Sequence, residues 1–206
     1  MKLFITTCMV FFCLTNSLGQ LPAESLYWEN EQLYVEKNIH FIAHQLDYPV
    51  EFLLNELPYG NFSVWQAQDR STYFYFNTSY LRFIRTQSPS LSIAVICVLA
   101  HEFGHVLLHH SEDGKGSTIA KELDADFMAG YICFLVGLQL DEATMGIRYL
   151  IENRYDTPTH PAKHKRLHAT QNGWKAAAQE VSISGVNTSK RYFLSSSVLG
   201  RYLKRK

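Results

Sequence analysis

Two histidines and a glutamate in the segment His101-Glu102-Phe103-Gly104-His105 have the types and spacing of a catalytic metal site. On a helix, residues four positions apart project from the same face, so His101 and His105 can bind one zinc ion together. Glu102 then lies beside the metal, where its carboxylate can take a proton from a bound water molecule. The segment therefore predicts a zinc-dependent hydrolytic site with Glu102 as the general base.

The third protein ligand must come from another part of the chain, because catalytic zinc usually has three protein ligands and one open position. The next predicted helix offers Glu122 and Asp126, which are four residues apart and share a face. Asp124 points in another direction and is expected to be solvated. Of the two facing acids, one can bind the metal while the other hydrogen-bonds a ligand histidine and fixes its orientation. The 16 residues between His105 and Glu122 are enough to end one helix, turn, and bring the next alongside.

The His-Glu-x-x-His pattern also occurs by chance on ordinary helices, so a plain core helix is the alternative interpretation. Two features of the surrounding sequence favour the metal site. A strongly apolar helix, predicted from about Leu91 to His110, carries the pattern. Gly104 within it is a poor helix former, by about 1 kcal/mol relative to alanine. We therefore expect the helix backbone to pass close to another element at this glycine.

The two segments together resemble a known family. Residues 100–106 and 122–126 match the pattern His-Glu-x-Gly-His followed by Glu-x-x-Ala-Asp. This pattern is similar to that of the gluzincins that include the prenyl (CAAX) endopeptidases and the heat-shock membrane proteases. Thr159-His160-Pro161 and Arg166 resemble the short downstream motif of that family, and residues 61–81 resemble the strand pair before its zinc helix. The resemblance extends over about residues 60–166.

By this resemblance the cofactor is Zn²⁺ and the reaction is the hydrolysis of peptide bonds. The implied site residues are the ligands His101, His105 and Glu122, the supporting residue Asp126, the base Glu102, and His160 and Arg166 as candidates for stabilising the oxyanion. The chain departs from the larger family members in showing no membrane-spanning segment after its first 19 residues. A second resemblance is to compact cytoplasmic gluzincins with a downstream glutamate, but a secretory signal argues against it. Metzincins are disfavoured, because their third histidine would fall at Ser111 and their glycine at Leu108.

The pattern of apolar and turn residues predicts a single α+β domain over residues 20–180. Helices are expected over about 24–57, interrupted at Pro49, and over 91–110, 118–136, 141–153 and 160–170, the last ended by Asn172-Gly173. Two strands at 62–67 and 72–76 are joined by a hairpin loop at 68–71. The predicted fold is zincin-like and mostly helical, with a small antiparallel sheet packed beside the zinc-binding helix. An edge of either strand is a candidate docking site for an extended peptide.

The ends of the chain are predicted to lie outside this domain. Residues 1–19 have the positive start, apolar run and small residues before Gln20 that are typical of a secretory signal peptide. They predict a secreted or periplasmic protein with no stable membrane insertion after signal removal, and a retained anchor is the alternative. Residues 181–206 are expected to form an extension with a basic tail. That tail is interpreted as a frayed soluble segment or, alternatively, as a weak contact with an anionic surface.

The overall composition excludes several classes of function. Apolar residues make up 47% of the 206 residues, which is enough for a sizeable core and argues against a disordered chain. The 19 basic and 19 acidic residues balance, so nothing indicates a nucleic-acid partner. The expected partner is a peptide or protein substrate, and no set of residues in the sequence defines its identity.

Cysteines and further histidines have two interpretations each. Cys97 and Cys133, which remain after signal removal, can form one disulfide bridge or stay as two buried free thiols. His109 continues the face of the motif histidines, but a favourable charge at a helix C-terminus is the simpler interpretation. A second metal site on the stripe formed by residues 160, 164 and 168 is less favoured than a solvated face.

Together these features predict a secreted zinc-dependent endopeptidase. One alternative is a domain that keeps the metal but has lost peptidase activity. The other is a secreted binding or structural domain without a metal, in which the two helices are ordinary core.

Overall fold

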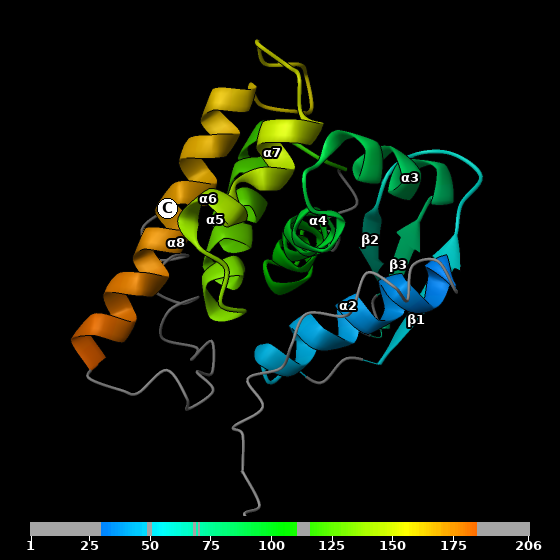
Figure 1. Cartoon of the computed structure of the whole chain (residues 1–206), viewed down its shortest axis with the longest axis horizontal. Coiled ribbons are helices and arrows are strands. Elements are labelled where there is room, and N and C mark those ends of the chain that lie inside the picture. The colour runs from blue at the N-terminus through cyan, green and yellow to red at the C-terminus, as the bar shows by residue number, and fades with distance from the viewer. Residues whose placement is uncertain (1–29, 49–50, 68, 70, 111–115, 185–206) are drawn as a thin grey trace, which may run out of the picture.

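The computed structural model describes residues 30–48, 51–67, 69, 71–110 and 116–184. These residues form an α+β fold that is mostly helical, with one small sheet. In chain order the elements are α2 (Glu31–Gln45), β1 (Phe52–Glu56), β2 (Ser63–Gln66), β3 (Thr72–Phe76), α3 (Thr78–Gln87), α4 (Leu91–Leu107), α5 (Ile119–Leu135), α6 (Leu140–Ala143), α7 (Met145–Leu150) and α8 (Lys163–Ser184). Figure 1 shows α4 in the middle of the molecule, with the sheet and α2 on one side and α5 and α8 on the other.

Helix α4 is central because nearly its whole surface is apolar. Most of its side chains are buried, as expected for a helix that is hydrophobic all round. Its start is capped by Ser90, whose hydroxyl oxygen accepts a hydrogen bond from the backbone N–H of Ile93 at 3.4 Å. The helix contacts α2, α3, β2, α5 and α7. The helix that carries the histidine pair is therefore held from several sides.

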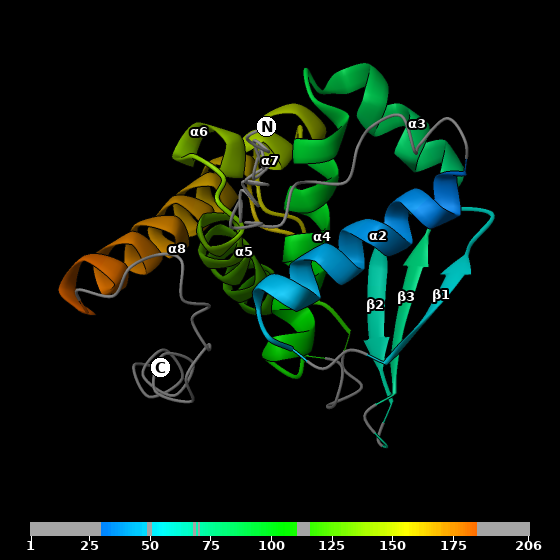
Figure 2. The same cartoon turned by 60° about the horizontal axis from the view of Figure 1, so that its bottom comes forward.

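The sheet has the order β1-β3-β2 and packs against α4. Strands β2 and β3 form the predicted hairpin and pair antiparallel, whereas β1 pairs parallel to β3. The prediction of an antiparallel sheet is therefore wrong, because the sheet is mixed. The buried side chains of β3 face the core, where the ring of Phe74 packs 5.2 Å from that of Phe103 on α4. Figure 2 shows the three strands side by side, with α2 crossing them.

Strand β1 lies in a segment that the sequence predicts to be helical. The prediction is confirmed over α2 but is wrong for residues 52–56. A short apolar run such as Phe52-Leu53-Leu54 fits a helix or a strand equally well by periodicity. Pairing with β3 decides between them, and the ring of Phe52 packs 5.6 Å from that of Phe74. Helix α3 was also missing from the prediction; Asn77 caps it by accepting a hydrogen bond from the backbone N–H of Tyr80 at 2.8 Å.

Glycines let α4, α5 and α8 pack backbone against backbone. A Cβ atom on Gly104 would lie 2.8 Å from the carbonyl oxygen of Ala125, so α4 and α5 approach closely at this glycine, as expected from the sequence. A Cβ atom on Gly173 would lie 1.8 Å from the carbonyl oxygen of Phe127 on α5. The prediction that Asn172-Gly173 ends a helix is wrong, since α8 continues past this pair to residue 184. The glycine here permits a close helix contact instead.

Gly173→Ala is expected to lower the free energy of unfolding by about 3 kcal/mol or more, because the added methyl group would overlap the α5 backbone. Asn172→Ala is the matched control. Asn172 is exposed on the same helix, so its replacement should change stability by no more than about 0.5 kcal/mol. Urea unfolding of both variants measures the difference. Equal midpoints for the two variants would contradict the close approach of α5 and α8.

Several other predictions are corrected or completed by the fold. The helix predicted over 141–153 is replaced by the two short helices α6 and α7. Cys97 and Cys133 are buried free thiols, so the bridged alternative is not formed. The boundary predicted at residue 180 falls inside α8, while the predicted signal peptide and most of the basic extension lie outside the described residues. Among the described residues, no helix is both long enough and apolar enough to cross a membrane.

Candidate metal centre

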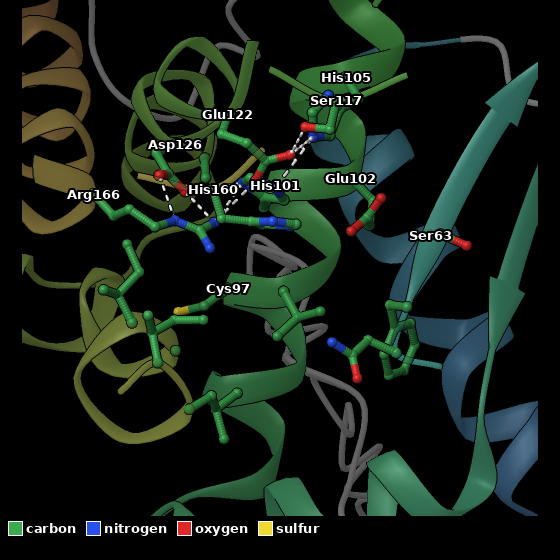
Figure 3. A pocket seen from close by; sticks show the side chains of 18 of the residues that line it. Ser63, Cys97, His101, Glu102, His105, Ser117, Glu122, Asp126, His160 and Arg166 are labelled. Carbon is green, nitrogen blue, oxygen red and sulfur yellow. Dashed lines mark hydrogen bonds and ion pairs between the residues drawn. The ribbon is translucent and has the colours of Figure 1, made fainter. Parts of the chain in front are cut away.

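Residues from three helices meet around one cavity of about 740 Å³. The site residues are His101, Glu102 and His105 from α4, Glu122 and Asp126 from α5, and Arg166 from α8. All of them are buried or nearly so. Figure 3 shows these side chains meeting between α4, α5 and α8, except that of Glu102, which lies on the side of α4 that faces the sheet. The antiparallel approach of α4 and α5, made close by Gly104, brings the carboxylates of α5 opposite the imidazoles of α4.

Two imidazoles and one carboxylate point their donor atoms at a common position. The Nε2 atoms of His101 and His105 lie 3.1 Å apart. Glu122 Oε2 lies 3.4 Å from His101 Nε2, and Glu122 Oε1 lies 3.6 Å from His105 Nε2. His101, His105 and Glu122 therefore form a group that can hold a metal ion, which we call the donor cluster.

The spacing of these donor atoms fits tetrahedral coordination. Ligand atoms about 2.0–2.1 Å from a zinc ion stand about 3.3–3.4 Å from one another in a tetrahedron. The two nitrogens are 3.1 Å apart, and each lies 3.4 or 3.6 Å from a different oxygen of the Glu122 carboxylate, so all three separations are close to that value. Two nitrogen donors and one oxygen donor are also a common set for zinc with an open fourth position.

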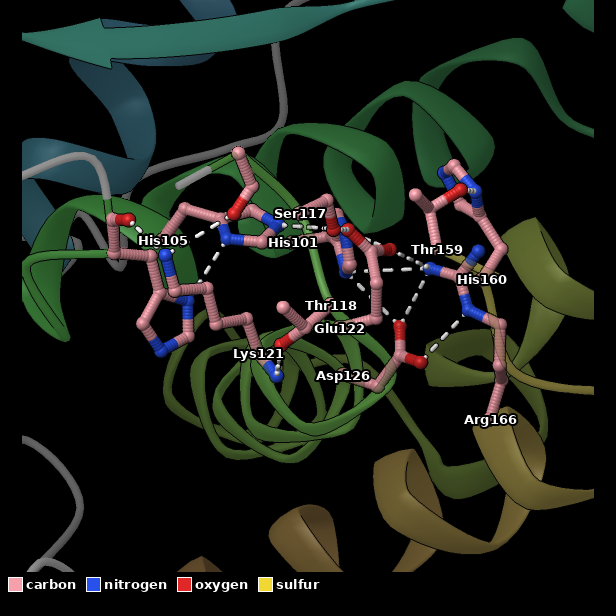
Figure 4. Close-up of polar contacts among 12 residues, drawn as sticks. His101, His105, Ser117, Thr118, Lys121, Glu122, Asp126, Thr159, His160 and Arg166 are labelled. Atoms are coloured by element: carbon pink, nitrogen blue, oxygen red, sulfur yellow. Dashed lines mark hydrogen bonds and ion pairs between the residues drawn. The ribbon is translucent and has the colours of Figure 1, made fainter. Parts of the chain in front are cut away.

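Asp126 and Arg166 hold His101 from the side away from the donor cluster. His101 Nδ1 lies 2.9 Å from Asp126 Oδ1, so this nitrogen carries the proton and donates to the carboxylate. Arg166 donates to both oxygens of Asp126, from Nε at 2.7 Å and from Nη2 at 2.8 Å. This bidentate ion pair fixes the plane of the Asp126 carboxylate (Figure 4). These contacts leave Nε2 as the nitrogen of His101 that faces His105 and Glu122.

The charges around His101 favour a cation at the cluster. Burial by itself lowers the pKa of His101, but the carboxylates of Asp126 and Glu122 outweigh burial and raise it to about 10. Burial lowers the pKa of His105 to about 3, and the neighbouring charge of His101 adds to this effect. Burial also acts to raise the pKa of Glu122, yet the hydrogen bonds from His101 and Ser117 hold it well below its ordinary value. Two carboxylates thus face His101, and positive charge is stabilised between them.

His105 is held by a partner that the sequence did not suggest. Its Nδ1 atom lies 2.9 Å from Nδ1 of His110, which follows the C-terminus of α4. The Lys121 ammonium group donates to the carbonyl oxygen of His110 at 2.8 Å and to that of Gly116 at 3.1 Å. Lys121 therefore ties the end of α4 to the start of α5. Ser117 also lies here, and its hydroxyl donates to Glu122.

Glu102 faces the cavity from the side of the sheet. The residue is 8% exposed, and its carboxyl group accepts a hydrogen bond from the backbone N–H of Val64 on β2. Burial raises the pKa of Glu102 to about 7, and the positive charge of His101 opposes this rise. Tyr80 of α3 lines the same cavity, and burial together with the charge of Glu102 raises the pKa of its hydroxyl to about 12. A carboxyl group with a pKa near neutrality next to a group of possible metal ligands has the properties expected of a general base.

The two residues suggested for oxyanion stabilisation occupy different environments. Arg166 is buried, and its guanidinium group is engaged with Asp126, with further contacts to His101 Nδ1 at 3.4 Å and to Glu122 at 3.7 Å. His160 is exposed at the wall of the same cavity, with its Nδ1 atom 2.8 Å from the hydroxyl of Thr159. Arg166 thus lies where it orients Asp126, whereas His160 lies at the cavity wall.

The lining of the cavity extends beyond the donor cluster. It includes residues 61–65 on and before β2, and residues of α6, α7 and the turn of α4 that precedes His101. In Figure 3, Cys97 and His105 lie on opposite sides of His101 along α4, while Ser63 lies beyond Glu102. Among the described residues, β2 pairs only with β3, so the side of β2 that faces Glu102 is the edge of the sheet.

Sequence reasoning missed the contacts that join distant parts of the chain. Nothing in their sequence spacing from the histidine motif predicts that Val64, Tyr80 and His110 contact the site. Ser117 directly precedes Thr118, the N-cap of α5, so its place near Glu122 could have been inferred from the helix start.

Comparison with protein-family models, with curated proteins and with solved structures finds no match to this chain.

Proposed function

We propose that this chain is a zinc-dependent endopeptidase of the gluzincin type. The observation that carries the proposal is the convergence of His101 Nε2, His105 Nε2 and the two carboxylate oxygens of Glu122, with separations of 3.1–3.6 Å, beside a buried glutamate. The α+β fold, the resemblance of the two helical segments to gluzincins and the supporting pair Asp126–Arg166 are consistent with it.

Zinc would be held by His101 Nε2, His105 Nε2 and the carboxylate of Glu122. Bound zinc supplies Lewis-acid chemistry, which polarises a carbonyl group and acidifies water. The side chains of the protein do the remaining work. Glu102 takes the proton of the attacking water and delivers it to the leaving amine, and its raised pKa suits both transfers near neutral pH.

The remaining site residues position these groups. Asp126, itself held by Arg166, keeps the proton of His101 on Nδ1 and so presents Nε2 to the cluster. The Val64 N–H holds the carboxyl group of Glu102 towards the cavity. The edge of β2 runs along the cavity, and an extended peptide can add to such an edge through backbone hydrogen bonds.

Cleavage of a diverse peptide mixture by the purified chain, with and without a chelator, tests the proposal directly. The expected result is cleavage that disappears with the chelator and returns when zinc is added. A chain with no cleavage in any of the three conditions would contradict the peptidase proposal.

The contact between His105 and His110 makes a separate prediction about metal affinity. For His105 to bind through Nε2, its Nδ1 must carry the proton and donate it to His110 Nδ1. His110→Ala removes this acceptor and is expected to weaken zinc binding about 10-fold or more. His110→Asn places a carbonyl oxygen near the Nδ1 position and should retain affinity within about 3-fold of wild type by the same hydrogen-bond argument.

His109→Ala is the control for this prediction. His109 is the neighbouring residue, and its Nδ1 atom lies 3.4 Å from the side-chain oxygen of Gln66 rather than at the cluster. Titration against a zinc-competing chromophoric chelator measures all three affinities. If His110→Ala and His109→Ala bind zinc equally well, His110 does not orient His105.

A further inference from the structure

Two cysteine side chains that the proposed mechanism does not use meet between α4 and α5. Cys97 lies on α4 and Cys133 lies on α5, and both are free thiols. The two thiols are hydrogen-bonded to each other. The Cys97 thiol also donates to the carbonyl oxygen of Glu142 at 3.3 Å and to that of Ala143 at 3.6 Å. The two sulfur atoms are therefore already neighbours in the reduced protein.

The packing of α4 against α5 explains why these thiols meet. The antiparallel helices come close at Gly104, where an added Cβ atom would lie 2.8 Å from the carbonyl oxygen of Ala125. Cys97 lies seven residues before Gly104 and Cys133 lies eight residues after Ala125, so both are about 10–12 Å from this contact in the same direction. A disulfide bridge needs Cα atoms within about 7 Å, which facing residues of two closely packed helices satisfy.

The two thiols differ in access and in acidity. Cys97 lines the cavity and is 7% exposed, whereas Cys133 is 0% exposed. The hydrogen bond from Cys133 lowers the pKa of Cys97 although burial opposes it, and the same hydrogen bond together with burial raises the pKa of Cys133. The thiolate is the nucleophile in disulfide exchange. Cys97 is therefore the thiol that reacts first with a small molecule in the cavity, and Cys133 is the thiol that follows.

We propose that Cys97 and Cys133 form a reversible disulfide bridge, which clamps α4 to α5 when the folded chain meets a small-molecule disulfide such as oxidised glutathione. The Cys97 thiolate attacks one sulfur of the oxidant and releases the first glutathione. The sulfur of Cys133 then attacks Sγ of Cys97 and releases the second. Two protein thiols and one glutathione disulfide become one protein disulfide and two glutathione thiols, and the two thiol protons end on the released glutathiones.

The bridge would join the two helices that carry all three residues of the donor cluster. It would close the loop from residue 97 to residue 133, which stabilises a protein mainly by restricting its unfolded chain. The predicted signal peptide would direct the chain to a compartment in which such bridges persist. This inference is independent of the proposed function, because it requires neither bound zinc nor peptide cleavage.

Oxidation of the folded, chelator-treated chain with oxidised glutathione tests the proposal. Peptide mapping by mass spectrometry, after alkylation of the remaining thiols, is expected to show a cross-link between Cys97 and Cys133. The melting temperature should rise by about 8–15 °C over the reduced protein and fall back with dithiothreitol. If both thiols are alkylated after this treatment, or if the cross-link leaves the melting temperature unchanged, the proposal is wrong.

The two single alanine variants test the order of the reaction. Cys133→Ala is expected to stop at a mixed disulfide between Cys97 and glutathione. Cys97→Ala should take up glutathione about 10-fold more slowly or not at all, because its remaining thiol is buried. Neither variant should gain stability on oxidation. Equal uptake of glutathione by the two variants would show that the thiols react only in unfolded chains, and would overturn the bridge in the folded protein.

Discussion

Glu102→Gln is expected to lower kcat for peptide cleavage by about 10²–10⁴-fold, because an amide cannot accept the proton of the attacking water. The substitution conserves size, and the amide oxygen can still accept the hydrogen bond from the Val64 N–H. The three donor residues are untouched. The variant should therefore fold like wild type and bind one equivalent of zinc.

The measurement combines steady-state cleavage of a fluorogenic peptide, based on a sequence cleaved in the peptide mixture, with metal analysis of the same samples. Glu152→Gln is the control, since Glu152 is exposed and does not line the cavity. It should keep wild-type kcat. Cleavage by Glu102→Gln at the wild-type rate would show that the activity comes from another site or from a contaminant.

The result also distinguishes the alternatives that the sequence left open. A chain that binds zinc at the cluster but cleaves nothing, with or without Glu102, is a metal-binding domain without peptidase activity. A chain that neither binds zinc nor cleaves peptides is a binding or structural domain, in which α4 and α5 only form part of the hydrophobic core. The measurements of activity and of metal binding are therefore needed together.

The parts of the site that lie on single helices could be predicted from the sequence, because helical geometry is local. The spacing of His101 and His105 and that of Glu122 and Asp126 follow from 3.6 residues per turn once each helix is recognised. Gly104 was expected at a close approach, and a Cβ atom there would meet Ala125 of α5 at 2.8 Å. The hairpin of β2 and β3 is local too and was predicted correctly.

The contacts between elements could not be predicted in the same way. The parallel pairing of β1 with β3 joins residues about 20 positions apart, and nothing in the short apolar run at 52–54 distinguishes a strand from a helix. Arg166 lies 40 residues from Asp126, and its role beside that carboxylate appears only when α8 packs on α5. Gly173 is a further example. Its local sequence indicates the end of a helix, but α8 continues through it because the missing side chain lets α8 pack against the backbone of α5.

The buried charges of the cluster lead to the second large effect, which is on stability. Glu102, Glu122 and Asp126 are each less than 10% exposed, and His101 and Arg166 supply the positive charge near them. A divalent cation bound by the donor atoms adds positive charge where these carboxylates converge. Because the cluster is assembled from α4 and α5, which are far apart in an unfolded chain, binding should be coupled to folding.

Zinc at about 100 times its dissociation constant is expected to stabilise the folded chain by about 2.7 kcal/mol, since it binds the folded state. For a chain of this size that corresponds to a rise in melting temperature of about 5–11 °C over chelated protein. Thermal melts followed by circular dichroism, after dialysis against a chelator and then with added zinc, measure the shift. The double variant His105→Ala/Glu122→Gln removes two of the three donors and should show a zinc-dependent shift of less than about 1 °C. A wild-type melting temperature that does not change with zinc, or an equal rise in the double variant, would show that the cluster is not the metal site.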